Sequence, residues 1–287
     1  MTVEQMTEWL KLGSGETGVN VRLWVSHLLR SWGVWHLASN GAWRRMQINR
    51  RPLIVFDVKK TLVDIKFLNP LFTDIFTTPG RMREWFAQVI LYSEALLLAG
   101  SYVAFGKLSG AALRMHGQIH GVAVTDDHVC QLGALMTDMP VHADVAAGLA
   151  VLKDAGFSIF TLTNSPNSAG PDVLDRAGLG SMFDQRFTVD TLPTPATYQL
   201  VQDTMAVAPD TTWLIAVHIW DTTGAQAFGG KTALVTRGVN ALPALDGIPQ
   251  PTLVAHDVGE AARAIAADED HSSEGNARLG PGLGDGE

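Results

Sequence analysis

The feature that most constrains the fold is a series of short apolar runs that alternate with segments of helical periodicity. The first run, 53–57, ends in the carboxylate of Asp57. Further runs predict strands at 157–163, 186–189, 212–217 and 233–236. The helices expected between and after these runs are 145–155, 172–177, 196–206 and one that begins at 224. Apolar strands that alternate with helices are typical of parallel sheets buried on both faces, so the sequence predicts an α/β fold with a doubly wound parallel sheet.

The stretch between the first two expected strands is too long for a simple crossover helix. Residues 67–140 have helical periodicity almost throughout, in blocks at 81–100, 101–120 and 125–139. We therefore expect an inserted helical cap at 67–140, on a Rossmann-like core made of 46–66 and 141–267. Two flanking segments complete the chain. Residues 1–45 predict a tryptophan-rich helical extension, and residues 268–287, which are acidic, glycine-rich and free of aromatic side chains, predict a disordered tail.

Net charge, cysteine content and the lengths of the apolar runs exclude several classes of protein. The net charge of −8 argues against general nucleic-acid binding. Cys130 is the single cysteine, so no disulfide can form within the chain and a reducing cytoplasm is the expected location. No apolar run reaches the roughly 18 residues of a spanning helix, so we expect no stable membrane insertion. The expected partner is a small-molecule substrate. A homodimer through the cap or the extension is left open, as is docking of the amphipathic stretch 21–37 on the core or on a membrane surface.

Polar side chains follow three of the expected strands at the point where each strand ends. They are Asp57 and Thr61, then Thr163 and Asn164, then His218 and Asp221. The carboxyl ends of parallel strands meet at one edge of the sheet, where open α/β folds bind ligands, so these groups predict a reaction centre. An aspartate there can attack an electrophilic carbon or phosphorus and form a covalent intermediate that water later cleaves.

Each of these residues also has a structural alternative. Thr61 is interpreted as a ligand of the carboxylate or as a helix N-cap, and Asn164 as an anion donor or the residue that closes a turn. His218 could be a general base or a hydrogen-bonded structural histidine, with the two readings weighted equally. The structural alternative is weakest for Asp57, because a carboxylate that ends a buried strand is costly unless it is used or paired.

Four segments in this order resemble the motifs of the haloacid dehalogenase superfamily. They are FDVKKTL at 56–62, LTNS at 162–165, PTPATY at 193–198 and HIWDTTGA at 218–225. The resemblance runs from about 53 to 267 and is greatest to the L-2-haloacid dehalogenase (type II) branch. It implies that Asp57 displaces halide from an α-carbon with inversion, and that the ester is then hydrolysed. It also implies that Thr163 and Asn164 match the serine or threonine and asparagine pair of that family.

The chain departs from the metal-dependent phosphatases of this superfamily at two positions. These enzymes carry a second aspartate two residues after the nucleophile, where this chain has Lys59. They also carry paired acids in the last motif, whereas Asp221 has no near acidic neighbour in the sequence. A magnesium ion needs several oxygen ligands, so we expect no metal and no cofactor.

The chain also departs from the dehalogenase pattern, because Leu192 stands where that branch has a lysine next to the nucleophile. Side chains of an extended segment alternate, so Lys59 is expected on the same side as Asp57. An ammonium group within about 4 Å of the carboxylate would keep it ionised. We therefore expect Lys59 to replace the missing lysine, with Lys60 facing solvent or the cap boundary. The alternative is that both are ordinary surface lysines on a turn.

The resemblance places a carboxylate- or halide-binding arginine of the cap at the position of Phe86. Arg81 and Arg83 are displaced substitutes for it. The candidate substrate-binding residues are Arg83, Trp85, Phe86, Tyr198 and Trp220. For Tyr198 and Trp220, packing is favoured over catalysis.

Three functions follow from these patterns. The first is a metal-independent hydrolase that works through an aspartyl ester on a small carboxylate-bearing substrate. The second is a repurposed enzyme that performs cyclisation, elimination or isomerisation, with Asp57 as acid or base, in a biosynthetic pathway. The third is a catalytically silent binding protein with the tryptophan-rich extension as its partner surface. The joint presence of Asp57, Thr61, Asn164 and Asp221 favours an enzyme over a silent protein.

Overall fold

The computed structural model describes residues 52–163, 172–188, 198, 201, 204–205, 207–238, 240–242 and 245–278, with side chains up to residue 271. The expected extension 1–45 lies outside these residues. Within the described part, no helix is both long and apolar enough to cross a membrane.

The centre of the fold is a six-stranded sheet whose strands are all parallel, in the order β3-β2-β1-β4-β5-β6. The strands are β1 (Leu53–Phe56), β2 (Ser158–Thr163), β3 (Gln185–Thr188), β4 (Thr212–Ala216), β5 (Lys231–Val235) and β6 (Leu253–Ala255). In the register of the sheet, Leu53 pairs with Ser158 on one side and with Thr212 on the other. The chain runs outward from β1 in both directions, so the strand order reverses between β1 and β4. This confirms the doubly wound sheet, and such a reversal is the place where open sheets bind ligands.

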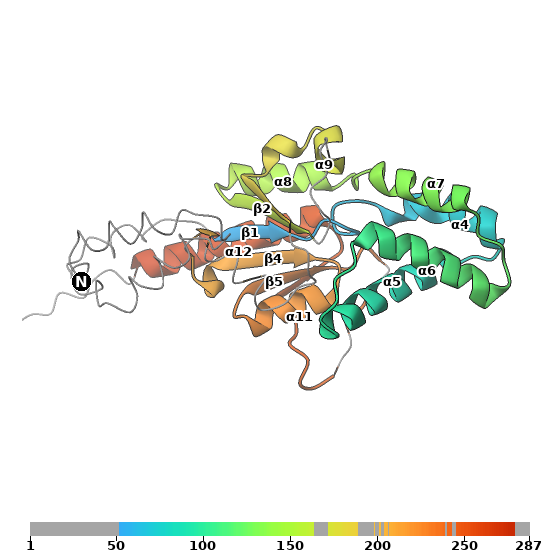
Figure 1. Ribbon diagram of the computed structural model, residues 1–287. Helices are drawn as coiled ribbons and strands as arrows, with labels where there is room; N and C mark the ends of the chain where they lie inside the picture. Colours follow the sequence, from blue (N-terminus) through green and yellow to red (C-terminus); the bar gives the residue numbers. More distant parts are fainter. Residues whose placement is uncertain are drawn as a thin grey trace, which may run out of the picture. The chain divides into compact units, whose positions relative to one another are not determined.

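Alternate residues of the strands pack into two separate cores, one on each face of the sheet. Ile54 and Phe56 point into the larger core, which also receives α8 (Val145–Asp154), α9 (Val173–Arg176) and α12 (Val258–Arg278). Leu53 and Val55 point into the smaller core, together with Ala225 of α11 (Ile219–Ala227). The two groups of helices lie on opposite sides of the sheet (Figure 1). Two short 3-10 turns, η3 (Gly180–Met182) and η4 (Pro209–Thr211), precede β3 and β4.

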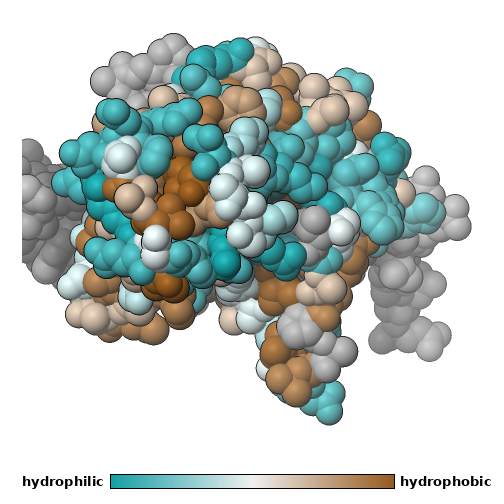
Figure 2. Space-filling model, turned by 90° about the vertical axis from the view of Figure 1, so that its right-hand side faces the viewer, coloured by the Kyte–Doolittle hydropathy of each residue, from teal (hydrophilic) through white to brown (hydrophobic). Residues whose placement is uncertain are grey.

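Between β1 and β2, the helices that precede α8 form a layer of their own beyond one end of the sheet (Figure 1). They are η2 (Ile65–Leu68), α4 (Asn69–Phe76), α5 (Arg81–Leu98), α6 (Phe105–His120) and α7 (Asp126–Thr137). Here we call 67–140 the helical segment. The indole of Trp85 anchors its interior, because it is fully buried against Phe72 and donates a hydrogen bond from Nε1 to the carbonyl oxygen of Ser109, at 3.0 Å. The surface on this side of the molecule is mainly hydrophilic, with scattered apolar patches (Figure 2).

The C-terminal helix corrects one expectation from the sequence. A disordered tail was expected from residue 268, but α12 continues to Arg278. Glu269 is buried, and its Oε1 accepts hydrogen bonds from Nε1 of Trp213, at 2.9 Å, and from Nζ of Lys231, at 2.7 Å. These partners lie on β4 and β5, far from Glu269 in the sequence. Their pairing fixes the helix beyond the point where its composition turns polar.

We expect Glu269→Ala to destabilise the fold by about 2–3 kcal/mol, because it leaves a buried indole N–H and a lysine without their acceptor. Urea unfolding followed by circular dichroism measures this difference. Asp268→Ala is the matched control, because Asp268 is half exposed and lies 3.6 Å from the same lysine. Its effect is expected within about 0.5 kcal/mol. Equal unfolding midpoints for the two variants would contradict the structural role of Glu269.

Candidate active site

The carboxylate of Asp57 stands at the carboxyl end of β1. Its backbone N–H donates to the carbonyl oxygen of Ile215, at 3.1 Å, which continues the pairing of β1 with β4 by one residue. Its Oδ2 accepts a hydrogen bond from Oγ1 of Thr61, at 2.6 Å. The side chain of Asp57 is 19 % exposed, so it is largely removed from water but open to a small molecule.

Thr61 ties this carboxylate to the neighbouring strand. The residue is fully buried, and its Oγ1 also accepts a hydrogen bond from the backbone N–H of Val217, at 3.0 Å. The carbonyl oxygen of Thr61 accepts from Nη2 of Arg237, at 2.6 Å, while Nη1 of Arg237 pairs with Asp144, at 2.8 Å. The turn that carries Asp57 is therefore held from β4 and from the end of β5. Arg237 could not be identified from the sequence, because its partners lie 93 and 176 residues away.

His218 and Asp221 lie beside Asp57, at the junction of β4 and α11. Nδ1 of His218 is 3.1 Å from Oδ2 of Asp221 and 3.7 Å from Oδ2 of Asp57. The imidazole is 6 % exposed and has an aromatic ring on each side. Trp220 stacks on it with ring centroids 4.4 Å apart, and Phe86 of α5 stacks at 6.0 Å. Nε2 of His218 is buried and has no hydrogen-bond partner among the described residues.

Burial shifts the proton affinities of these three groups. Loss of solvation raises the pKa of Asp57 to about 6, and the nearby charge of Asp221 adds to this. Burial and the charge of Glu94 raise the pKa of Asp221 to about 7. Burial lowers the pKa of His218 to about 4, although Asp57 opposes this shift. At neutral pH, Asp57 is therefore mainly ionised, His218 is neutral and Asp221 is partly protonated.

Both lysines of the turn point toward aromatic rings of the helical segment. Nζ of Lys59 lies 3.3 Å from the ring centroid of Phe105, and burial lowers its pKa to about 7, against the attraction of Asp57. Nζ of Lys60 lies 4.8 Å from the ring centroid of Phe86. Burial and the charge of Arg83 lower the pKa of Lys60, and Asp57 opposes this shift. The charge of Asp57 acts on Lys59, but among the described residues Nζ of Lys59 lies on the ring of Phe105 and forms no ion pair with Asp57, so the replacement of the missing lysine by Lys59 stays a prediction. Lys60 lies at the boundary with the helical segment.

The aromatic residues that were expected to bind substrate lie in different environments. Trp85 is a correction, because it is fully buried in the core of the helical segment rather than placed to bind substrate. Phe86, the next residue on α5, faces His218. Tyr198 is buried in the smaller core and donates from its hydroxyl group to the carbonyl oxygen of Asp221, at 2.9 Å, which fits the packing alternative. Trp220 is 40 % exposed.

Four further positions were singled out in the sequence, and two of them lie outside the described residues. Arg83 is exposed and acts on the site through its charge on Lys60. Thr163 is half-buried at the end of β2. Asn164 lies outside the described residues, as does Leu192 in the third motif. The sequence analysis missed Glu94, because only the fold brings α5 close enough for its charge to act on Asp221.

Asp57, His218 and Asp221 could in principle hold a metal ion, because one ligand atom from each lies within 4.8 Å of the others. Magnesium prefers six oxygen ligands in an octahedron, whereas these residues offer two carboxylates and an imidazole nitrogen. The charge of Asp57 also acts on the pKa of Lys59 and of Lys60, so two lysines lie near this set of side chains. This set of side chains fits magnesium poorly.

Because the pKa of Asp221 is raised, the free energy of unfolding should depend on pH. A carboxyl group with a raised pKa in the folded state contributes stability below its unfolded pKa of about 4, and this contribution is lost as the pH rises through about 7. Asp221→Asn should therefore match the wild type closely at pH 4 and be more stable than it at pH 8, by about 2–4 kcal/mol. Unfolding by urea at a series of pH values measures the difference. A difference that stays constant or shrinks with rising pH would contradict the buried state of this carboxyl group.

Comparison with known proteins agrees with this geometry. The haloacid dehalogenase-like hydrolase family matches residues 52–229. An (S)-2-haloacid dehalogenase of Pseudomonas putida is 28 % identical over 213 residues, which cover 72 % of this chain and 94 % of that protein. An (S)-2-haloacid dehalogenase of Xanthobacter autotrophicus is 26 % identical over 196 residues, which cover 64 % and 74 %.

Solved structures share the fold at lower identity. A dehalogenase with an intermediate complex aligns with a TM-score of 0.69 at 21 % identity, over 76 % of this chain and 98 % of that one. The L-2-haloacid dehalogenase of Xanthobacter autotrophicus with chloropropionic acid covalently bound aligns with a TM-score of 0.64 at 22 % identity, over 75 % and 98 %. Because the family match covers more than half of the 287 residues, the chain belongs to the haloacid dehalogenase-like hydrolases, and it is similar to (S)-2-haloacid dehalogenases among them.

Proposed function

We propose that the protein hydrolyses a small (S)-2-haloacid, with Asp57 as the nucleophile. A carboxylate oxygen of Asp57 attacks the α-carbon and displaces the halide with inversion, which forms an ester. Water then attacks the carboxyl carbon of that ester and releases the (R)-2-hydroxy acid. The observation that carries this proposal is the position of Asp57, at the strand end with Oδ2 held by Thr61. This contact orients the group, so we assign the attack to Oδ1.

The names of related proteins support the choice of substrate class. The curated relatives are (S)-2-haloacid dehalogenases, and one solved relative carries covalently bound chloropropionic acid. A carboxylate that ends a buried strand and keeps a pKa of about 6 is ionised at neutral pH, as a nucleophile must be.

The charge of the substrate requires cations near the nucleophile. A 2-haloacid is an anion, and its approach to ionised Asp57 is unfavourable without positive charge. The charge of Asp57 opposes the lowering of the pKa of both Lys59 and Lys60, so two ammonium groups lie within its electrostatic reach, and Arg83 acts on Lys60. A bound anion would raise the pKa of Lys59 from about 7 and keep it charged. Lys59 thus takes the part that the resemblance gives to the lysine missing at Leu192.

The second half of the reaction needs a base for the attacking water. His218 is neutral at neutral pH, and its Nδ1 lies 3.7 Å from Asp57 and 3.1 Å from Asp221. We assign the proton of the water to the His218–Asp221 pair, because the pKa of Asp221 is about 7. The rings of Phe86 and Trp220 on either side of the imidazole keep bulk water away from it. In this scheme all steps use side chains of the chain, and no metal is needed.

Asp57→Asn should abolish halide release from (S)-2-chloropropionate, assayed in the presence of EDTA. In the wild type, a single turnover in ¹⁸O-labelled water should place the label in the side chain of Asp57, because water attacks the ester at that carboxyl carbon. Mass spectrometry of the peptide that contains residue 57 detects it. Label found only in the hydroxy acid would rule out the ester, and wild-type activity that is lost in EDTA and restored by Mg²⁺ would rule out the metal-free scheme.

Lys59→Met should lower kcat/KM by about 100- to 1000-fold, the range seen when a group that stabilises developing charge is removed. The acid limb of the pH profile, expected near pH 6 from Asp57, should also move to higher pH, because a neighbouring positive charge favours the ionised carboxylate. Lys66→Met is the matched control, since Lys66 is exposed on η2. An unchanged rate in Lys59→Met would show that this lysine does not act on the nucleophile.

A further inference from the structure

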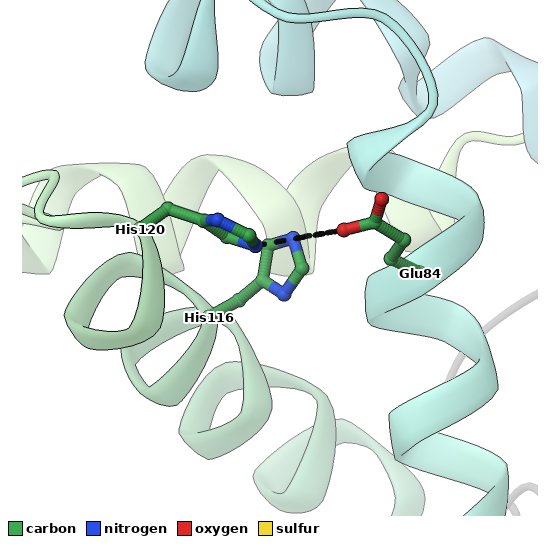
Figure 3. A group of neighbouring side chains, drawn as sticks. All are labelled: Glu84, His116 and His120. Carbon is green, nitrogen blue, oxygen red and sulfur yellow. Dashed lines mark ion pairs between the residues drawn. The ribbon is translucent and has the colours of Figure 1, made fainter.

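A second cluster of titratable side chains lies within the helical segment, away from Asp57. Glu84 stands in the first turn of α5, while His116 and His120 lie four residues apart on α6. Residues at this spacing share one face of a helix, so the two imidazoles project together toward Glu84 (Figure 3). Nothing in the proposed reaction uses these three side chains.

The spacing of their ligand atoms suits a metal ion. Oε2 of Glu84 is 3.6 Å from Nε2 of His116 and 3.5 Å from Nε2 of His120, and one ligand atom of each residue lies within 4.8 Å of the others. Tetrahedral zinc with bonds of about 2.1 Å separates its ligand atoms by about 3.4 Å. Two of the three separations therefore already match the edge of such a tetrahedron.

The environment of His116 points independently to a ligand. His116 is 1 % exposed, and neither of its ring nitrogens has a hydrogen-bond partner among the described residues. A buried polar atom without a partner is costly, and such atoms are rare unless something fills the gap. The ring of Phe76 packs edge-on against both imidazoles, with centroids 5.0 and 6.2 Å away, and fixes their orientation. Burial also lowers the pKa of His116, which favours the neutral form that binds metals.

We propose that Glu84, His116 and His120 bind a divalent transition-metal ion such as Zn²⁺, with water as the fourth ligand. Two imidazoles and one carboxylate form a common protein ligand set for zinc. The ion would join α5 to α6. Phe86 follows Glu84 by two residues and stacks on His218, so the ion would also hold the helix that forms one wall of the active site.

The guanidinium group of Arg81 lies between two of these ligands. Its Nη1 lies 2.6 Å from Oε2 of Glu84 and 3.2 Å from Nε2 of His120, so its positive charge occupies the place that the ion would take. The side chain of Arg81 is 23 % exposed and can turn toward solvent. Arg81 therefore competes with the metal, and its removal should strengthen metal binding.

The test uses the full chain, freed of metal by a chelator and titrated with Zn²⁺ in a calorimeter. Co²⁺ serves as a second probe, because its visible absorption reports tetrahedral coordination. The wild type should bind one equivalent at this cluster, and excess Zn²⁺ should raise its melting temperature. Glu84→Gln and His120→Asn should each weaken binding by more than about tenfold, the smallest loss seen when even an outer partner of a ligand is removed.

Arg81→Gln should bind Zn²⁺ more tightly than the wild type, while His271→Ala, which removes an exposed histidine of α12, should bind it equally. Glu84 and His120 are partly exposed, so these variants are expected to fold, and circular dichroism verifies that they do. The proposal is overturned if the wild type shows no saturable binding. It is equally overturned if Glu84→Gln and His120→Asn bind as well as the wild type, or if Arg81→Gln binds no more tightly.

Discussion

The site depends on one hydroxyl group. Oγ1 of Thr61 donates to Asp57 and accepts from the backbone of Val217, so a single atom joins the carboxylate after β1 to the end of β4. This junction is where the strand order reverses, and it is also where His218 and Asp221 enter the site. Because Arg237 holds the carbonyl oxygen of Thr61 and pairs with Asp144, the turn cannot move without breaking an ion pair that is itself largely buried. The position of the carboxylate is thus a property of the sheet rather than of a loose loop.

The same burial that fixes these groups brings their proton affinities together. Removal from water raises the pKa of Asp57 and Asp221 and lowers that of His218 and Lys59, so that four groups with ordinary values from about 4 to 10 fall between about 4 and 7. Proton transfer between groups of similar affinity costs little. A buried site of mixed charge can therefore pass a proton from water to a neighbouring base near neutral pH, which the proposed hydrolysis of the ester requires.

The sequence predicted the sheet well, because a parallel strand buried on both faces leaves a continuous apolar run. It missed β6, which has three residues and leaves Val254 at its centre exposed. It also began the disordered tail too early, at residue 268, because Glu269 is stabilised by partners on distant strands. Asp57, Thr61, His218 and Asp221 were predicted from their places at strand ends. Trp85 was expected to bind substrate, but adjacent residues of a helix lie about 100° apart, so Phe86 faces His218 while Trp85 is buried within the helical segment.

The lysine side chains near Asp57 lie on the core and not on the helical segment, which differs from the pattern that the family resemblance implies. That pattern puts a cationic side chain on the cap, whereas α5 and α6 present Phe86 and Phe105 here, and the cations come from Lys59 and Lys60 on the core turn. The aromatic faces attract the ammonium groups, and so do Asp57 and any bound anion. In the proposed reaction, the carboxylate of the substrate draws the lysines away from the rings and shares them with Asp57. Its binding and the reactivity of Asp57 are coupled through the same two charges, so a change at either ring should alter both together.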